Sequence, residues 1–270
     1  MKVIYWNVSP DIISIGPVTI RWYGLLFALS FIVGFQIMSV IYRRENKPEK
    51  DINDLIWYMI LGTVVGARLG HCLFYNPGYY LSHPVEILMI WKGGLASHGA
   101  AIGILTAIYF YTKKNKDVSY LWLLDRIVIT VALSGFFIRM GNLFNSEIIG
   151  KPTNSTWGVV FVAVDNIPRH PAQFYESVAY LLIFIFLFGL YLTTNGKLKP
   201  GLLFGYFLIL VFSFRFFVEF LKENQSYFEE GLMFNMGQLL SIPFILFGIF
   251  LLFRKEKKII KKNDSLNRFG

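Results

Sequence analysis

Long apolar segments, separated by short polar ones, dominate the chain from residue 17 to residue 253. A segment of about 20 apolar residues is long enough to cross the hydrocarbon core of a bilayer as a helix. Seven segments reach roughly that length, near residues 17–41, 55–75, 86–111, 119–138, 174–193, 202–221 and 237–253. This pattern predicts an all-α, polytopic integral membrane protein with about seven transmembrane helices in one domain, residues 1–270.

The composition supports a membrane protein. Hydrophobic residues make up 55% of the 270 residues and charged residues only 16%, which is too much apolar surface for a soluble domain of this length. The N-terminal residues MKVIYWNVSPDIISIG lack the charged region, apolar run and small-residue cleavage site of a removable signal peptide. We therefore expect the first span to direct the chain to its membrane.

Lysine and arginine gather in alternate connections between the spans. The connections after the first, third and fifth spans carry Arg43, Arg44, Lys47, Lys50, Lys113, Lys114, Lys116, Lys197 and Lys199, and a basic tail, residues 254–270, follows the last span. Cytoplasmic loops are enriched in these residues, so the N-terminus is predicted to be extracytoplasmic and the C-terminus cytoplasmic. The net charge of +9 is then mostly an orientation signal, and no basic patch interleaved with aromatic residues indicates nucleic acid binding. The long outside connection, about residues 142–173, is expected to form a small extracytoplasmic cap.

Polar side chains within the predicted spans fall in their outer halves. The set comes from six spans and comprises Arg21, Tyr23, Arg68, His71, Lys92, His98, Arg139, Asn142, Glu147, Gln173, Glu176, Arg215 and Glu219. One ionisable residue near a helix end can extend to the interface at little cost, but ionisable groups inside a membrane usually mark a functional interior. So many on one side predict a shared polar cavity that opens to the outer leaflet.

Three arginines in this set indicate a phosphate ligand. Arg68, Arg139 and Arg215 offer planar forks of donors suited to phosphate, and phospholipid head groups are the abundant phosphates at that depth. Arg215 and Glu219 are four residues apart and share a helical face. Structural pairing between spans is the alternative explanation for these groups.

His98 lies in the segment WKGGLASHGA, where glycines flank it. Histidine accepts a proton near neutral pH, which makes His98 the candidate general base; a structural histidine between helices is the alternative. The four histidines are scattered, and we do not expect a metal site. The single cysteine, Cys72, is expected to be a small buried apolar residue.

Six motifs, in this order and spacing, make the chain resemble the bacterial phosphatidylglycerol prolipoprotein diacylglyceryl transferases over most of its length. They are IRWYG with Tyr23, GARLG followed by LFYNP with Arg68, WKGGLASHGA with His98, RMGNLFNSEIIG with Arg139, Asn142, Asn145 and Glu147, RHPAQFYES with Gln173, Tyr175 and Glu176, and RFFVEF with Arg215 and Glu219. Three positions depart from the family's pattern: Ala100 and Ile138 replace glycines, and Val211 replaces a tyrosine of some members. The first two change packing more than chemistry, and the third argues against a general role for that tyrosine.

The resemblance implies an enzyme of lipoprotein maturation in the bacterial inner membrane. The diacylglyceryl group of phosphatidylglycerol would move to the lipobox cysteine of a prolipoprotein as a thioether, and glycerol-1-phosphate would leave. The implied partners are phosphatidylglycerol, prolipoprotein signal peptides and membrane lipids, and no cofactor or metal is needed.

The resemblance also implies roles for individual residues. Arg139 and Arg215 would hold the phosphate, with Glu219 orienting Arg215. Asn142, Glu147 and Arg68 would bind the lipid head group, or Asn142 and Glu147 would brace the arginines. His98 would be the base, and Tyr23 would assist it or fix the lipid. Supporting positions are Gly99, Asn145, Gln173 and Glu176.

Two other functional classes were weighed. An intramembrane protease would need a serine with its base, paired aspartates or a zinc motif, and the sequence lacks these. A lipid or anion transporter with an arginine-lined outer cavity stays open, although alternating access favours a site near the membrane midplane.

Overall fold

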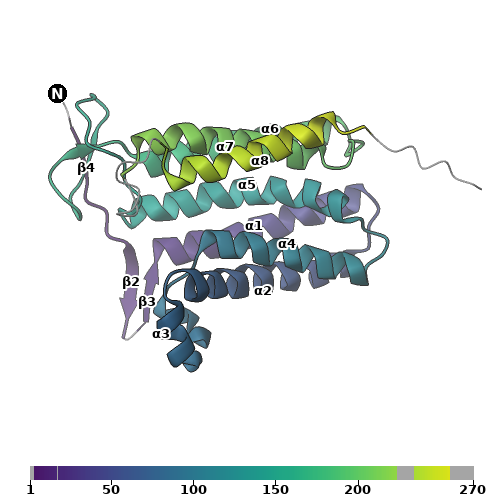
Figure 1. The fold of residues 1–270 in the computed structure, drawn as a ribbon, viewed down its shortest axis with the longest axis horizontal. Coiled ribbons are helices and arrows are strands. Elements are labelled where there is room, and N and C mark those ends of the chain that lie inside the picture. Colours follow the sequence, from purple (N-terminus) through teal and green to yellow (C-terminus); the bar gives the residue numbers. More distant parts are fainter. Residues whose placement is uncertain (1–2, 17, 224–233, 256–270) are drawn as a thin grey trace, which may run out of the picture.

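A bundle of long helices that lie side by side forms most of the protein (Figure 1). The structure, a computed structural model, describes residues 3–16, 18–223 and 234–255. The long helices in these residues are α1 (Trp22–Arg44), α2 (Glu49–Phe74), α4 (Ser97–Lys114), α5 (Tyr120–Phe144), α6 (Ala172–Thr193), α7 (Leu202–Val218) and α8 (Met236–Phe253). Each overlaps one of the predicted apolar segments. All but the first two residues of the predicted basic tail lie outside the described residues.

Six of the described helices are long and apolar enough to cross a membrane. The exception is α4, which has 18 residues and ends in Lys113 and Lys114. The prediction of seven spans is therefore confirmed only for six helices of the described chain. These six helices make this a multi-pass membrane protein.

The predicted third span, residues 86–111, begins eleven residues too early. Residues 84–92 form two short 3₁₀ helices, η1 (Pro84–Leu88) and η2 (Ile90–Lys92), after the short helix α3 (Pro77–Ser82). Gly93 and Gly94 then adopt positive φ angles of 82° and 72°, a conformation that stops a right-handed helix. The α-helix starts only at Ser97.

Short strands make the all-α prediction wrong in detail. A three-stranded sheet has the order β1 (Ile4–Trp6), β4 (Val159–Phe161) and β5 (Pro168–Arg169), and β2 (Asp11–Ile15) pairs with β3 (Val18–Arg21) in a hairpin. Strands of two to five residues carry too little periodicity for a sequence pattern to reveal them. Residues 142–144 end α5 and residues 172–173 begin α6, so the predicted cap contains β4 and β5 between two helix ends.

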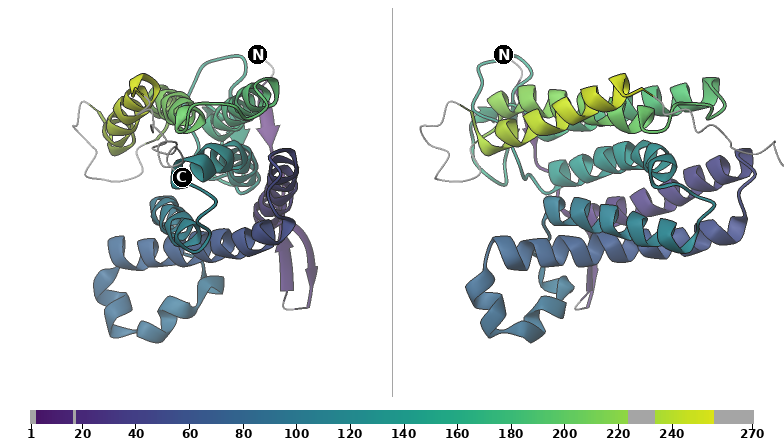
Figure 2. Two further views of the ribbon diagram at one scale, coloured as in Figure 1. Left: turned by 90° about the vertical axis from the view of Figure 1, so that its right-hand side faces the viewer. Right: turned by 45° about the vertical axis from the view of Figure 1, so that its right-hand side comes forward.

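Helix α5 occupies the centre of the bundle and packs against α1, α6 and α7 (Figures 1 and 2). Its buried residues include Leu123, Ile127 and Ile129, and they join a core with Tyr42 of α1 and Leu187 of α6. A helix that is apolar on every side is expected at the centre of a membrane protein. The polar residues at the end of α5 are thus surrounded by other helices.

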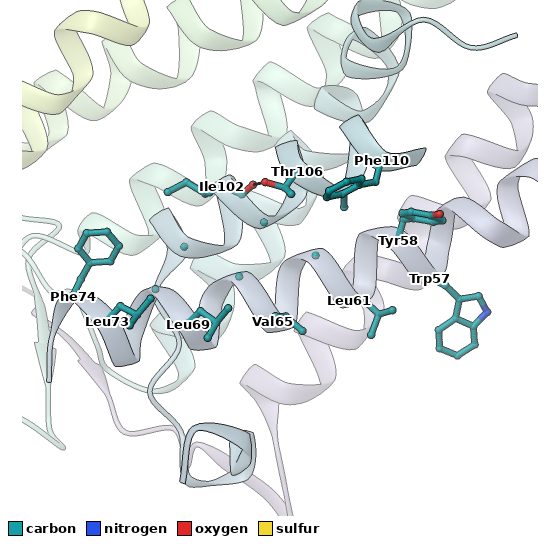
Figure 3. A pocket seen from close by; sticks show the side chains of 16 residues that line it. Trp57, Tyr58, Leu61, Val65, Leu69, Leu73, Phe74, Ile102, Thr106 and Phe110 are labelled. Atoms are coloured by element: carbon teal, nitrogen blue, oxygen red, sulfur yellow. Dashed lines mark hydrogen bonds between the residues drawn. The ribbon is translucent and has the colours of Figure 1, made fainter. Parts of the chain in front are cut away.

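Glycines bring α2 and α4 into backbone contact. A Cβ atom on Gly103 would lie 2.0 Å from the carbonyl oxygen of Gly62, and one on Gly99 would lie 2.3 Å from that of Gly66. Small residues four apart allow membrane helices this close approach. The two helices also line an apolar groove of about 550 Å³ that runs from Trp57 to Phe74 (Figure 3). Cys72 is buried on α2, as predicted.

At the end of the bundle away from the strands, Arg126 and Glu45 form a buried pair. The Arg126 guanidinium donates to both carboxylate oxygens of Glu45, at 3.0 and 3.1 Å, and Trp122 Nε1 donates to one of them at 2.7 Å. Asp125 accepts hydrogen bonds from the backbone N–H groups of Gly201 and Phe204 and so caps α7. These charged groups are paired with one another, so we interpret them as structural.

Candidate active site

Four helix ends meet near the sheet and carry most of the predicted site residues. They are the last turn of α5, the first turns of α6 and α8, and the end of α7 with the following 3₁₀ turn η3 (Glu219–Leu221). Figure 1 shows these ends on the side of the molecule where β4 lies. The polar set is therefore gathered by tertiary packing from segments far apart in sequence.

Arg139 lies at the centre of this cluster. Its Nε is 3.1 Å from Oε2 of Glu176 on α6, and its Nη1 donates to Oδ1 of Asn142 at 3.2 Å. The Glu176 side chain is fully buried, whereas 15% of the Arg139 side chain is exposed. Buried charges need partners of this kind, and the exposed part of the guanidinium is left to face a ligand.

Asn142 connects Arg139 to the loop after α5 through hydrogen bonds. Its Nδ2 donates to Oε2 of Glu147 at 3.3 Å, and Asn145 Nδ2 donates to Oε1 of the same carboxylate at 3.2 Å. Ser146 and Ile148, on either side of Glu147, have positive φ angles of 53° and 55°, an uncommon conformation for residues other than glycine. The loop therefore turns sharply to bring Glu147 back to the helix end.

Tyr23 packs beside the same helix turn. A Cβ atom on Gly141 would lie 2.7 Å from Cδ2 of Tyr23, so the glycine makes room for the ring. Glu147 and Arg139 are the charged neighbours of the Tyr23 hydroxyl. The structure thus brings together Tyr23, Arg139, Asn142 and Glu147, as the sequence predicted.

The second arginine lies on α7. Arg215 Nε is 3.8 Å from Oε1 of Glu219, and 36% of the Arg215 side chain is exposed. Glu219 also accepts hydrogen bonds from Lys222 Nζ at 2.8 Å and from Asn235 Nδ2 at 3.2 Å. A Cβ atom on Gly237 would lie 2.8 Å from this carboxylate, so a glycine in the first turn of α8 makes room for Glu219. The predicted pairing of Arg215 with Glu219 is confirmed.

Lys222 links the two arginine–carboxylate pairs. Its Nζ lies 3.7 Å from Oε1 of Glu176 as well as 2.8 Å from Glu219. Lys222 and Asn235 were not among the predicted site residues. Lys222 follows Glu219 by three residues, a spacing that could have revealed the contact, whereas Asn235 approaches from the chain beyond residues 224–233 and no local pattern could have revealed it.

Gln173 completes the buried polar face of α6. It is 0% exposed, like Glu176 and Ser177, and within the described residues its amide atoms have no hydrogen-bond partner. Gln173 and Glu176 are three residues apart and so share a helical face toward α5. The predicted supporting positions Gln173 and Glu176 are therefore both buried at the cluster.

In the described residues, the contacts of His98 are with the end of α2 and not with this cluster. It is exposed in the first turn of α4, and its ring is 5.3 Å from the ring of Phe74 and 5.9 Å from that of Tyr75. Within the described residues, no hydrogen bond, ion pair or ring contact joins His98 to Arg139 or Arg215. The following residue, Gly99, is one of the glycines packed against α2.

Arg68 occupies a cage of backbone carbonyls. It is only 3% exposed, and its guanidinium donates to Glu86 at 2.5 Å, Gly93 at 2.6 Å, Ile87 at 2.9 Å and Gly94 at 3.3 Å. It also stacks on Tyr80 at 5.0 Å. These contacts fasten the segment that leads into α4, and they engage the donors that were predicted to bind the lipid head group.

Two carboxylates outside the helices that cross the membrane have lowered pKa values. A hydrogen bond from Lys92 is the main cause for Glu86, and a hydrogen bond from Arg169 is the main cause for Asp165. Arg169 donates to Asp165 at 2.6 and 2.9 Å and to Glu223 at 2.6 Å. These ion pairs fix the connections around the cluster, and none of them involves an arginine or a carboxylate of the cluster itself.

Comparison with known proteins identifies the family of this chain. The profile of the family described as prolipoprotein diacylglyceryl transferase matches residues 10–254. Proteins named phosphatidylglycerol–prolipoprotein diacylglyceryl transferase match from Chloroherpeton thalassium, with 52% identity over 94% of this chain and 95% of the relative, and from Tolumonas auensis, with 49% identity over 95% and 99%. The relative of that name from Bacteroides fragilis is 44% identical over 96% of this chain and 98% of its own.

The matches cover nearly the whole chain, including every residue of the cluster. They give no support to the alternative of a lipid or anion transporter. The chain belongs to the prolipoprotein diacylglyceryl transferase family.

Proposed function

We propose that this membrane protein transfers the diacylglyceryl group of phosphatidylglycerol to a prolipoprotein. The family and the names of its relatives support this activity, which makes the protein a transferase. The observation that carries the assignment to a site is the pair of arginines, Arg139 and Arg215, each held by a buried glutamate and each partly exposed. Such an arrangement suits an anionic head group at the membrane surface.

The proposed reaction takes place at the lipobox cysteine of the prolipoprotein. The cysteine loses its proton to a base, and the thiolate attacks the diacylglyceryl carbon that bears the phosphate. A carbon–sulfur bond forms while the carbon–oxygen bond breaks, and its electron pair stays on the phosphate oxygen. The products are a thioether and glycerol-1-phosphate, whose phosphate has gained negative charge.

Arg139 and Arg215 would stabilise this developing charge. Donors that are already oriented toward the site of charge development lower the barrier most. Glu176 and Glu219 orient the two guanidinium groups through ion pairs at 3.1 and 3.8 Å. We assign both arginines to phosphate binding in the ground state and in the transition state.

Asn142, Glu147 and Tyr23 would form one wall of the site. The hydrogen bonds from Arg139 through Asn142 to Glu147 favour bracing of Arg139, and the exposed Glu147 carboxylate can also accept a glycerol hydroxyl. Asn145 holds the other oxygen of Glu147. Tyr23, beside this carboxylate, would contact the lipid.

His98 is proposed as the base that deprotonates the thiol. It is exposed at the beginning of α4, so an incoming peptide can reach it, and Tyr23 is the second candidate. Arg68 we now assign to holding the segment before α4, because its guanidinium is occupied by four carbonyl groups. Gly99 supports His98 by allowing α4 to pack on α2.

We also propose that α4 is a seventh span and that the cluster faces the outside of the bacterial inner membrane. Arg43, Arg44, Lys113 and Lys114 are all at the opposite ends of their helices, as expected for a cytoplasmic side. The sheet of β1, β4 and β5 would then be the extracytoplasmic cap. The N-terminus would be outside and the C-terminus inside.

The test is a release assay with the purified full-length protein in phosphatidylglycerol vesicles. We expect glycerol phosphate to appear only when a peptide with a lipobox cysteine is added, and a thioether-linked diacylglyceryl group to appear on that peptide. A peptide with serine at the same position is the control and should give no release. Release that is independent of the cysteine would contradict the proposal.

A further inference from the structure

Lys222 is a fully buried lysine between two carboxylates. It lies directly after η3 and is only 2% exposed. Its Nζ is 2.8 Å from Oε1 of Glu219 and 3.7 Å from Oε1 of Glu176. Lysine is almost never buried in this way unless its charge is paired.

The two carboxylates that Lys222 contacts are the partners of the two arginines. Arg139 approaches Oε2 of Glu176, whereas Lys222 approaches Oε1. Arg215 and Lys222 both approach Oε1 of Glu219. Arg139 on α5 and Arg215 on α7 are therefore joined into one chain of alternating charges, with Lys222 at its middle.

The backbone holds Lys222 in this position from the side of the cap. Gly150 forms an antiparallel bridge with Lys222, and Lys151 N–H donates to the carbonyl of Leu221 at 2.8 Å. A Cβ atom on Gly150 would lie 2.7 Å from that carbonyl, so a larger residue there would displace the backbone of Leu221 and Lys222. The position of Lys222 is thus fixed by the loop that follows α5.

We propose that Lys222 is a positioning residue for the diacylglyceryl transfer, acting by keeping Glu176 and Glu219 paired so that both arginines present their free donors to one phosphate. This inference rests on the proposed function. Without the ammonium group, the arginines would be the remaining cations beside the two buried carboxylates in the described residues, and a buried charge that loses a charged partner is costly. The guanidinium groups would turn toward the carboxylates and away from the phosphate.

The experiment compares Lys222→Met with the parent protein in the release assay. The kcat should fall about 10- to 100-fold, because the misplaced donors stabilise the developing phosphate charge less well. The KM for phosphatidylglycerol should change by less than roughly 5-fold, because the rest of the lipid keeps its contacts with the protein. Lys151→Met is the matched control, because the exposed side chain of Lys151, in the loop after α5, donates to the carbonyl of Phe220 and has no carboxylate partner among the described residues. Its kcat should equal that of the parent.

A second variant separates positioning from folding. Lys222→Arg keeps a cation between Glu176 and Glu219, so its kcat should be several-fold higher than that of Lys222→Met. Should Lys222→Met fail to accumulate, Lys222→Gln is compared with Lys222→Arg by the same criterion. A parental kcat per folded molecule in Lys222→Met, or a kcat of Lys222→Arg as low as that of Lys222→Met, would overturn the inference. Failure of the parent itself to release glycerol phosphate would instead overturn the proposed function.

Discussion

Arg139 on α5 and Glu176 on α6 form an ion pair in which Nε lies 3.1 Å from Oε2, with the carboxylate fully buried and the guanidinium partly exposed. The pair is buried on one side and open on the other, which lets a fixed charge face a ligand. Arg215 and Glu219 repeat this relationship on α7.

The glycine contact between α2 and α4 should be intolerant of even one methyl group. In Gly103→Ala the new Cβ would lie 2.0 Å from a backbone oxygen of α2, and a backbone atom cannot move aside as a side chain can. We expect a loss of about 1–3 kcal/mol in stability, measured by thermal unfolding of the purified protein in detergent. Gly189→Ala on α6 is the control, since nothing lies within 4 Å of its Cβ; equal unfolding temperatures for the two variants would contradict the packing.

The pair of Asp165 and Arg169 should make the cap sensitive to acid. The hydrogen bond from Arg169 lowers the pKa of Asp165 below its ordinary value, so the pair stabilises the fold fully above that ordinary value, about 3.9, and loses its effect as the pH falls through the lowered pKa. Asp165→Asn should therefore unfold at a lower temperature than the parent at pH 7, and the difference should shrink below about pH 4. A difference of the same size at pH 3 and pH 7 would rule out this ion pair as its source.

The proposed orientation predicts opposite outcomes for two reporter fusions. A reporter after Asn145, in the turn beyond α5, should behave as extracytoplasmic, and one after Lys258 should behave as cytoplasmic, because the basic connections favour the inside. Alkaline phosphatase activity, which requires export, measures the first, and fluorescence of a cytoplasmic reporter measures the second. The reverse pattern would place the arginine cluster at the wrong leaflet.

The base assignment predicts a pH-dependent defect for His98→Gln. Transfer should be slower by about 10²- to 10⁴-fold near pH 7, the usual contribution of a general base, and part of the rate should return toward pH 8.5, where a thiol ionises without help. His83→Gln is a matched control, because His83 is an exposed histidine of the neighbouring segment that stacks on Tyr79. A defect that stays constant with pH would assign His98 to positioning.

The sequence predicted the helices well and their connections poorly. Apolar runs of spanning length overlap all the long helices of the described chain, with ends that differ by up to six residues, apart from the start of α4, where Gly93 and Gly94 interrupt the run with positive φ angles. The pairing of β1 with β4 could not be predicted, because Ile4 and Val159 are neighbours only through tertiary folding.

Most residues of the cluster at the helix ends were predicted, but only some of their contacts were, and the predicted site residues His98 and Arg68 have their contacts elsewhere. Residues three or four apart on one helix, such as Arg139 with Asn142 and Arg215 with Glu219, were paired correctly because helix geometry alone brings them together. The partners from other helices, Glu176 for Arg139 and Lys222 for both carboxylates, depend on how helices pack. For Arg68 the partners in the structure differ from the predicted one. Its charge suggested a phosphate ligand, but carbonyl groups of the loop before α4 surround its guanidinium.

The central claim is that Arg139 binds the phosphate that leaves, and the most direct measurement is turnover of Arg139→Lys per inserted molecule in the glycerol phosphate release assay. Lysine keeps the charge but loses the bidentate fork, so the rate should fall about 30- to 1000-fold, which corresponds to about 2–4 kcal/mol. Arg43→Lys is the control, because this arginine is exposed at the other end of the bundle and its one side-chain hydrogen bond within the described chain goes to a carbonyl of its own helix. If Arg139→Lys turned over as fast as Arg43→Lys, Arg139 would not be the phosphate clamp and the site would lie elsewhere.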